Sequence, residues 1–294
     1  CNSITVAIDQ YGRLFAWGSY EYSGSAGSPV PVQIGDRSNL VRCMVGWDRV
    51  LVLDSDKKLW QVSLWDGAFT EIPFAKGIVQ INMDTGGWSP GTYYAIDTDG
   101  SLWVWGKNNN GMMGFGDTTD RANPTKHDNY WKSVAMGGWH TLAVKSDGTL
   151  WSSGSHSNGQ LGLGEVGAVT TLTQVGVATN WVSVFAYSNS SFAVNSIGEL
   201  YACGWNFYGC LGLGDTTQRS SFEKVGDYNT DIYVSGATHT AMLLYNGIVY
   251  LSGRNSNSGI SGSNVFTSIQ LSDCIGCHCF GDSEIYFAIK RRSV

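Results

Sequence analysis

Short runs of apolar residues recur along the whole chain, separated by polar or glycine-rich turns. One stretch shows the pattern clearly, with apolar runs at residues 131–136, 141–144, 149–152 and 172–175. The second and third runs flank Asp147-Gly148, and an Asp-Gly pair between two apolar runs is a strong signal for a tight β-hairpin. No segment keeps the helical period of about 3.6 residues for more than a few positions. The pattern therefore predicts an all-β chain built from units of four short strands.

The hairpin turn returns at regular intervals. Its position is occupied in successive units by Gly12, Lys57, Gly100, Gly148, Gly198 and Gly247, which lie 43–50 residues apart. A period of this length indicates a solenoid or a propeller, and four short strands are the content of one propeller blade. A parallel β-helix is the alternative, and the hairpin turns argue against it. At Lys57 the glycine is absent, so we expect another turn type or a left-handed non-glycine residue there.

Strand signals do not occur equally often. Those for the second strand of the unit occur seven times, and those for the other three occur six times each. Because two second strands cannot share one place, the count predicts a seven-bladed β-propeller of four-stranded antiparallel blades with incomplete first and last blades. A six-bladed ring is the alternative. A segment upstream of Cys1 would supply the strands that are missing. We expect one domain over residues 1–294, with units at roughly residues 1–38, 39–76, 77–128, 129–178, 179–228, 229–272 and 273–294.

Composition and charge disfavour several kinds of partner. The chain is 43% hydrophobic and only 14% charged, with a formal net charge of −6. Its one basic run is Lys290-Arg291-Arg292, so nucleic-acid binding by phosphate neutralisation is disfavoured. No apolar run has the length of a membrane-spanning helix, and we expect no membrane insertion. The seven cysteines follow no regular spacing, which favours small buried side chains over a disulfide scaffold.

A longer motif surrounds the hairpins in the middle of the chain. It comprises residues 137–144, Asp147-Gly148 and residues 154–164, and near copies occupy residues 204–215 and 106–117. In the last copy Met112-Met113 replaces a Gln-Leu pair. These residues resemble the repeats of the regulator of chromosome condensation family, over essentially the whole chain and most sharply over residues 92–255.

The resemblance implies a seven-bladed propeller and several kinds of activity. The best-known activity in that family is nucleotide exchange on a small GTPase, carried by a wedge inserted in one blade. Periods of 43–50 residues leave no room for such an insertion here. Other members are interaction modules, and one secreted type resembles a protein inhibitor of β-lactamases. One fold hosts many unrelated functions, so the resemblance does not choose among these activities.

Residues that could carry chemistry have plainer structural interpretations. Cys277, His278 and Cys279 are suitable zinc ligands, but alternation along a strand places His278 opposite the two cysteines, so we expect no metal. His140 and His239 hold the same repeat position, which favours a structural role. The glycine-rich loops lack the Lys-Ser/Thr pair of a phosphate-binding loop, and no nucleophile elbow precedes a helix. We therefore expect no enzymatic activity, no cofactor and no small-molecule ligand.

Aromatic residues concentrate in two sets of loops and form the predicted partner surface. Between first and second strands these residues are Trp47, Trp88 and Trp139. After the third strands they are Tyr20, Tyr22, Trp65, Phe207 and Tyr208, with Asn109 as a polar neighbour. Aromatic side chains are enriched at protein interfaces and at their hot spots. The alternative is that some of these rings pack between blades.

The sequence as a whole favours a non-enzymatic module that binds protein partners. We expect it to belong to a larger assembly such as a virion or a surface appendage, in an extracellular or particle-surface location rather than a nuclear one. A guanine-nucleotide exchange factor for a small GTPase is the first alternative. A secreted inhibitor or a glycan-binding propeller is the second.

Overall fold

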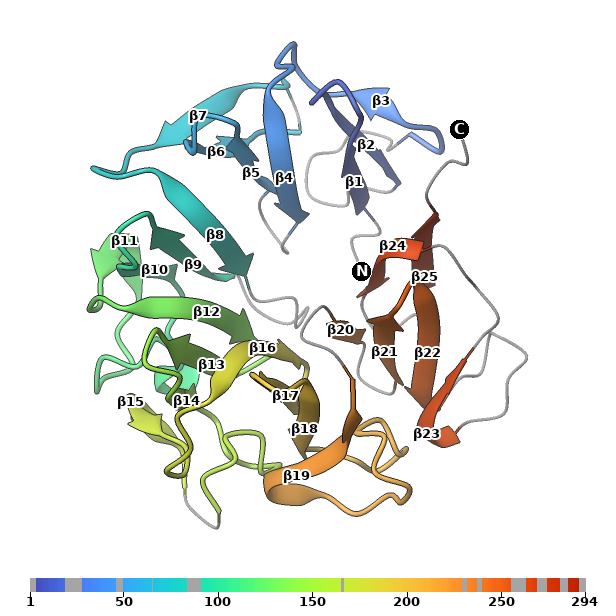
Figure 1. Ribbon diagram of the computed structural model, residues 1–294. Helices are drawn as coiled ribbons and strands as arrows, with labels where there is room; N and C mark the ends of the chain where they lie inside the picture. The colour runs from blue at the N-terminus through green and yellow to red at the C-terminus, as the bar shows by residue number, and fades with distance from the viewer. Residues whose placement is uncertain are drawn as a thin grey trace.

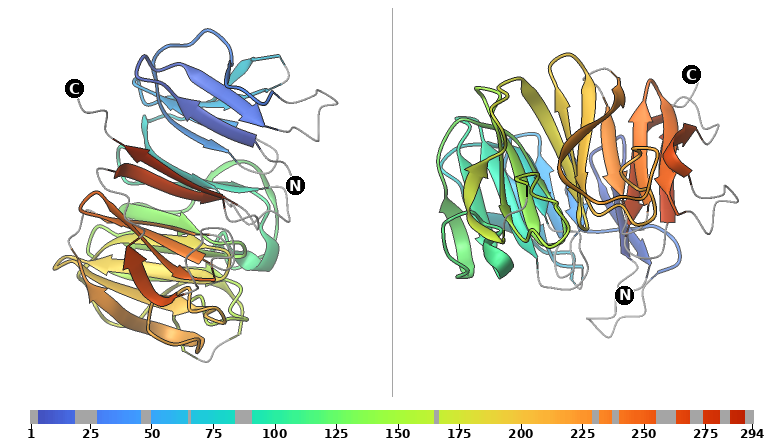
Figure 2. Two further views of the ribbon diagram at one scale, coloured as in Figure 1. Left: turned by 90° about the vertical axis from the view of Figure 1, so that its right-hand side faces the viewer. Right: turned by 90° about the horizontal axis from the view of Figure 1, so that it is seen from below.

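The computed structural model describes residues 4–18, 28–45, 50–64, 66–83, 91–164, 167–228, 232–236, 240–254, 263–268, 274–280 and 285–290. Regular structure in these ranges is β-strand, together with one 3₁₀ turn, η1 (Asn109–Gly111). The sheets follow one another in chain order around a ring (Figure 1) and stand side by side when the ring is seen from its edge (Figure 2). The fold is an all-β propeller with four-stranded antiparallel blades, as the repeat predicts.

The hydrogen-bonded sheets divide the chain in sequence order. The first sheet has three strands, β1 (Ile4–Ile8), β2 (Leu14–Gly18) and β3 (Val32–Gln33). Five four-stranded sheets follow, namely β4 (Leu40–Val45), β5 (Val50–Asp54), β6 (Leu59–Val62) and β7 (Phe69–Ile72); β8 (Ile78–Met83), β9 (Thr92–Asp97), β10 (Leu102–Gly106) and β11 (Arg121–Lys126); β12 (Trp131–Met136), β13 (His140–Lys145), β14 (Leu150–Gly154) and β15 (Val169–Gln174); β16 (Trp181–Tyr187), β17 (Ser190–Asn195), β18 (Glu199–Gly204) and β19 (Arg219–Asp227); and β20 (Tyr233–Gly236), β21 (Thr240–Tyr245), β22 (Ile248–Gly253) and β23 (Ser263–Ser268). The last sheet pairs β24 (Cys274–Phe280) with β25 (Ile285–Lys290).

The number of blades differs from the leading expectation of seven. Six sheets of three or four strands form the blades, which is the alternative count, and β24 and β25 add a two-stranded ladder. That ladder supplies only a first and a second strand. The third and fourth strands nearest to it in the ring, β2 and β3, are already paired with β1 (Figure 1). Among the described residues, no strand extends the ladder beyond β25.

In the hairpins of the second and third blades, an aspartate at the end of the second strand accepts hydrogen bonds from the turn. Asp97 Oδ1 accepts hydrogen bonds from the backbone N–H groups of Asp99 and Ser101, each at 2.9 Å. Asp97 Oδ2 accepts a further hydrogen bond, also at 2.9 Å, from Trp103 Nε1 on the third strand. Asp54 makes the same three kinds of contact one blade earlier. Aspartate before the turn thus satisfies backbone donors that the tight turn would leave unpaired.

Apolar side chains fill the space between neighbouring blades. Met112 and Met113, from the loop after β10, are almost completely buried and pack against side chains of β12 in the next blade. Leu161 and Leu211 take the corresponding places in the next two blades and are fully buried. Removing such a side chain from water contributes about 1.5–3 kcal/mol. The loops after the third strands therefore join each blade to the one that follows.

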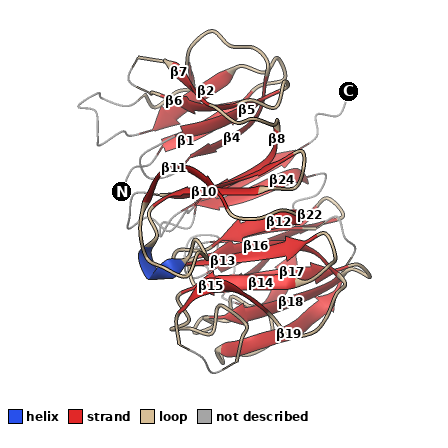
Figure 3. Ribbon diagram, turned by 90° about the vertical axis from the view of Figure 1, so that its left-hand side faces the viewer, coloured by secondary structure: helices blue, strands red, loops and turns tan. Residues whose placement is uncertain are grey.

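The strand register gives the ring two different faces. The turns between second and third strands lie at the same end as the starts of the first strands, because Trp131 N donates to Gly100 O at 2.9 Å and Trp181 N donates to Gly148 O at 3.0 Å. We call this end the hairpin face. The opposite end, called the loop face, carries the connections after the first and third strands, and η1 lies there (Figure 3).

Candidate interaction surfaces

Buried asparagines shape the long loops of the loop face. Asn206 is fully buried, and its Nδ2 donates hydrogen bonds to the carbonyl oxygens of Asp215 and Thr217, each at 3.1 Å. Its Oδ1 accepts a hydrogen bond at 2.9 Å from the backbone N–H of Leu211. One amide group thus ties both ends of the loop together while Leu211 enters the core.

The loop after β10 repeats this arrangement and adds an ion pair. Asn108 Oδ1 accepts from Met113 N at 2.9 Å, and Asn108 Nδ2 donates to Asp117 O at 2.9 Å. Arg121 Nη2 lies 3.0 Å from Asp117 Oδ2. Hydrogen bonds from Arg121, with a smaller contribution from the Thr119 backbone, lower the pKa of the Asp117 carboxyl to about 2. This carboxylate is therefore ionised at neutral pH and positions the loop.

The intervening loop lacks this network at its centre. His156 occupies the place of the two asparagines, and it is buried. Its Nδ1 has no hydrogen-bond partner among the described residues. The two flanking loops therefore have a buried side chain that hydrogen-bonds to their backbone, whereas the His156 Nδ1 atom of the loop between them makes no such bond to a described residue.

An aromatic cluster lies beside Asn206 on the loop face. It consists of Trp205, Phe207 and Tyr208. The ring centroids are 6.3 Å apart for Trp205 and Phe207, 5.4 Å for Trp205 and Tyr208, and 5.0 Å for Phe207 and Tyr208. The Arg254 guanidinium carbon lies 5.4 Å from the centroid of the Tyr208 ring. Phe207 is 66% exposed, so a large apolar ring of this cluster faces solvent.

Exposed apolar side chains also occur on the hairpin face, one or two to a blade. They sit in the hairpin turns, in the connections between blades and at the starts of first strands, and they are Tyr11, Val41, Val79, Tyr130, Val177, Ile197 and Tyr233. The sequence alone does not distinguish these residues from core residues, because apolar residues in or next to strands are expected to be buried. Val41 and Val79 sit at register irregularities near the starts of their strands, and a bulge is the feature that turns such a side chain outward.

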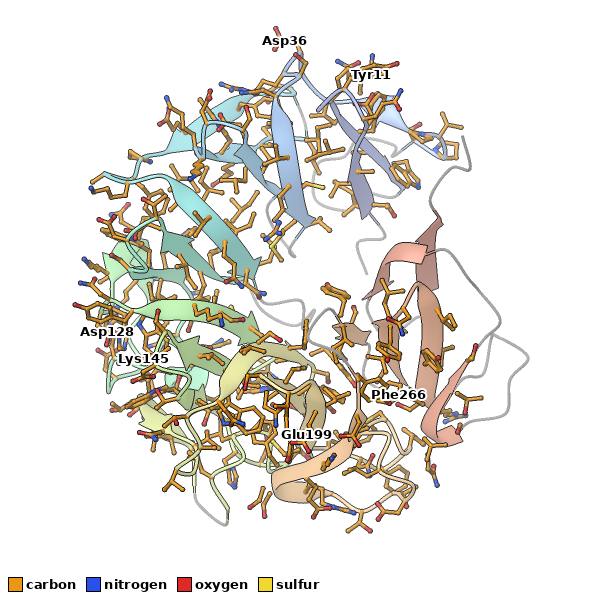
Figure 4. All side chains as sticks on the ribbon, viewed as in Figure 1. Tyr11, Asp36, Asp128, Lys145, Glu199 and Phe266 are labelled. Carbon is orange, nitrogen blue, oxygen red and sulfur yellow. The ribbon has the colours of Figure 1, made fainter. Side chains whose placement is uncertain are left out.

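Charged side chains line the outer rim. Lys145 Nζ lies 3.0 Å from Asp128 Oδ2 and 4.7 Å from the ring centroids of both Trp131 and Trp151 (Figure 4). Glu199 is likewise paired with Lys224, at 2.6 Å. These charges are neutralised within single blades, so the rim offers no strong field of one sign.

Family models of the regulator of chromosome condensation (RCC1) repeat match residues 99–144 and 131–160. Residues 99–160 of the chain are thus similar to RCC1 repeats. The matched segments contain β10 to β13 and the loop that holds Asn108, which is where the repeat motif is sharpest in the sequence. Among the curated proteins, no sequence matches this chain.

Three solved structures share the fold over nearly the whole length of the chain. Prp20p from Saccharomyces cerevisiae, described with its binding properties to Gsp1p and histones, is 18% identical with a TM-score of 0.79, over 99% of this chain and 81% of that one. Yeast RCC1 (Prp20) bound to Kap60 is 17% identical with a TM-score of 0.78, over 99% and 79%. Human WBSCR16 is 15% identical with a TM-score of 0.79, over 98% and 85%. Identity at this level establishes the propeller fold alone.

The structure locates some of the residues predicted to form the partner surface. Phe207 and Tyr208 lie in the aromatic cluster, and Asn109 is exposed at the start of η1. Trp139 is half-buried, and its carbonyl oxygen accepts a hydrogen bond from Ser155 N at 2.8 Å. The other candidates lie outside the described residues, namely Trp47, Trp88, Tyr20, Tyr22 and Trp65.

Three potentially reactive side chains of the described residues, those of His140, Cys43 and Cys210, have pKa values shifted by burial. His140 is fully buried, and burial lowers the pKa of its imidazole to about 3. Burial raises the pKa of the Cys43 and Cys210 thiols to about 11, so both stay protonated at neutral pH. The side chains of Cys277 and Cys279 lie outside the described residues, although the alternation predicted for them rests on a strand that is present as β24.

Metal-binding clusters and membrane-spanning helices are both absent from the described part of the chain. No group of three or more histidine, cysteine, aspartate or glutamate side chains lies close enough there to hold a metal ion. Helices of the length and apolar character needed to cross a membrane are absent from the same residues.

Proposed function

We propose that this propeller is a non-enzymatic interaction module that binds a protein partner through its loop face. The aromatic cluster of Trp205, Phe207 and Tyr208 would anchor that partner. The observation that carries the proposal is the exposure of Phe207, at 66%, within three rings that contact one another. Binding hot spots are enriched in tryptophan, tyrosine and arginine, and clusters of this kind dominate interface energies.

The hairpin face is a weaker candidate for the same role. Its exposed apolar residues are three valines, one isoleucine and three tyrosines, spread over several blades, and valine is under-represented among hot spots. Scattered single apolar side chains are normal on protein surfaces. The asparagine networks also hold the loop face in shape before binding, which lowers the entropy lost on association.

The test compares substitutions on the two faces of the full-length chain. Partners captured by the parent protein from extracts of its source are quantified against the Phe207→Ala and Tyr130→Ala variants, since Tyr130 is an equally exposed ring on the hairpin face. We expect Phe207→Ala to lose a specific partner and Tyr130→Ala to keep it. Both variants should retain the unfolding free energy to within about 0.5 kcal/mol, as surface changes usually do. A partner retained by Phe207→Ala and lost by Tyr130→Ala would contradict the proposal.

Guanine-nucleotide exchange on a small GTPase is the second candidate. It is favoured by the likeness to Prp20p, whose structure is described together with binding to Gsp1p. An exchange assay on purified small GTPases with a fluorescent guanine nucleotide separates the two candidates, because a module without exchange activity leaves the release rate unchanged. Membership of a larger assembly, a secreted inhibitor role and glycan binding stay predictions from sequence.

A further inference from the structure

The hairpin of the second blade has a lysine at the turn position and a glycine at the residue that faces it. Lys57 occupies the turn position and adopts φ 64°, a left-handed conformation that disfavours any residue with a side chain. In the other blades a glycine stands there, and at two of these positions a side chain would clash with the next blade: a Cβ on Gly12 would lie 2.6 Å from Ser38 O, and one on Gly148 would lie 2.1 Å from Thr179 O. At Lys57 the facing residue is Gly77, and the stem of Lys57 lies over it.

The contact between Lys57 and Gly77 is close. A Cβ added to Gly77 would lie 2.8 Å from Lys57 Cβ, so any side chain at position 77 would displace the lysine. Two substitutions relative to the other units, lysine for glycine and glycine at the facing position, together place one charged side chain between the blades. Residues with strained backbone conformations cluster at functional sites, which makes the Lys57 side chain a candidate for ligand binding.

Lys57 borders a pocket between the second and third blades, at the hairpin face. The pocket has a volume of about 200 Å³, and three lysines line it, Lys57, Lys58 and Lys76. Two carboxylates, Asp56 and Glu71, also line it, so the pocket is more cationic than anionic in a chain whose net charge is −6.

The lysines of the pocket are available to a ligand. Lys57 forms no ion pair with any described residue. Lys58 Nζ lies 3.5 Å from Glu71, and Lys76 Nζ lies 3.4 Å from Asp99. Both pairs are about half exposed, and ion pairs of this kind contribute little to stability. An incoming anion therefore competes for these ammonium groups at small cost.

The pocket also has an apolar wall. Phe74 is among its lining residues, and its ring is held edge-on to Trp103 at 5.5 Å between centroids. Pockets for drug-sized ligands measure roughly 300–1,000 Å³, so this one suits a smaller molecule. Lysine ammonium groups bind phosphate and carboxylate as point charges, and an aromatic ring accepts the apolar part of a ligand.

We propose that this pocket is a binding site for a small organic anion, with its phosphate or carboxylate group at Lys57, Lys58 and Lys76 and its apolar body against Phe74. The sequence predicts no small-molecule ligand, because the lining residues, which come almost entirely from the second unit, form no motif. The site lies on the opposite face from the aromatic cluster and does not depend on the proposed partner.

The experiment is an amide NMR titration of the full chain with four probes. Phenyl phosphate and benzoate carry both the charge and the ring, whereas inorganic phosphate carries only the charge and phenol only the ring. We expect the first two to shift the amide signals of Lys57, Lys58 and Gly77 at millimolar concentration, and the stronger of the two identifies the anionic group. No shift at these amides with either ligand would overturn the proposal. Inorganic phosphate binding as tightly as phenyl phosphate would overturn the role of Phe74.

The decisive variant is Lys57→Gly, which restores the residue that other blades have at the turn. It removes the left-handed strain, so it should fold with an unchanged or higher thermal midpoint. Affinity for phenyl phosphate should fall about tenfold, the loss expected from one charge-assisted hydrogen bond. Lys132→Gln, which removes an exposed lysine of the fourth blade, is the charge-matched control and should bind normally. Equal affinity in the Lys57→Gly variant and the parent would show that Lys57 has only a structural role and would refute the site.

Discussion

His140 Nε2 lies 2.8 Å from Ser191 Oγ, and this hydrogen bond joins the second strands of two successive blades, β13 and β17. The Ser191 hydroxyl in turn donates to Gln160 O at 2.6 Å, in the loop between those blades. Because the imidazole is fully buried, the histidine is neutral in the folded protein. Protonation would place an uncompensated charge between two blades.

This burial predicts a specific loss of stability in mild acid. The pKa of His140 is about 3 when folded and about 6.5 when unfolded, so between these values the unfolded chain binds the extra proton. Stability then rises with pH, and the free energy of unfolding should fall by about 2 kcal/mol through His140 between pH 7 and pH 5. Urea unfolding of the parent and of His140→Leu at several pH values measures this slope. The slope should be smaller in His140→Leu than in the parent, and equal slopes in the two proteins would contradict the assignment.

The amide of Asn206 predicts a second measurable cost. Asn206→Ala removes the side-chain acceptor of the buried Leu211 N–H and a donor to the Asp215 carbonyl, whereas the exposed Thr217 carbonyl keeps its hydrogen bond from Arg219 Nη1. Leaving buried polar groups unpaired costs about 1–3 kcal/mol, so the free energy of unfolding should fall by at least that much. Chemical denaturation measures it, with Asn109→Ala as the exposed control that should change stability by less than about 0.5 kcal/mol. A cost as small as that of the control would mean that the loop is held by other contacts.

The hairpin glycines should differ in their tolerance of alanine. Gly148 and Gly100 share a positive φ, but a Cβ on Gly148 would lie 2.1 Å from Thr179 O, whereas one on Gly100 would meet its nearest atom at 3.4 Å. Gly100→Ala should therefore cost only the left-handed strain, about 1–2 kcal/mol. Gly148→Ala should cost more, because the neighbouring blade must also move. Thermal unfolding of the two variants ranks them, and equal midpoints would indicate that contact with the next blade carries no penalty.

The four-stranded repeat could be predicted from the sequence because each hairpin depends on residues that are close together in the chain. Asp97 before a tight turn and Trp103 after it predict a hairpin without any knowledge of the rest of the chain. The left-handed alternative expected at Lys57 is confirmed by its φ of 64°. The number of blades was less accessible, because it depends on how the ends of the chain pair. The lysine pocket was not predicted, because its three lysines are exposed single charges that form no motif.

The same holds for the candidate surfaces. Phe207 and Tyr208 could be selected from the sequence because loop aromatics next to asparagine stand out in a repeat. The exposure of Val41 could not, since an apolar residue in a strand reads as core until a bulge turns it outward. Burial depends on the neighbouring blade, and no local pattern encodes that neighbour.

The packing of Met112 has a consequence for recombining such proteins. Its carbonyl oxygen accepts hydrogen bonds from Tyr94 of its own blade and from Ser153 of the next, at 2.7 and 2.9 Å. A chimera cut at sheet boundaries would separate this loop from the blade on which it was shaped. Shuffling experiments should therefore exchange the blade of Tyr94 and the blade of Ser153 as one module, so that the Met112 loop keeps both hydrogen-bond donors.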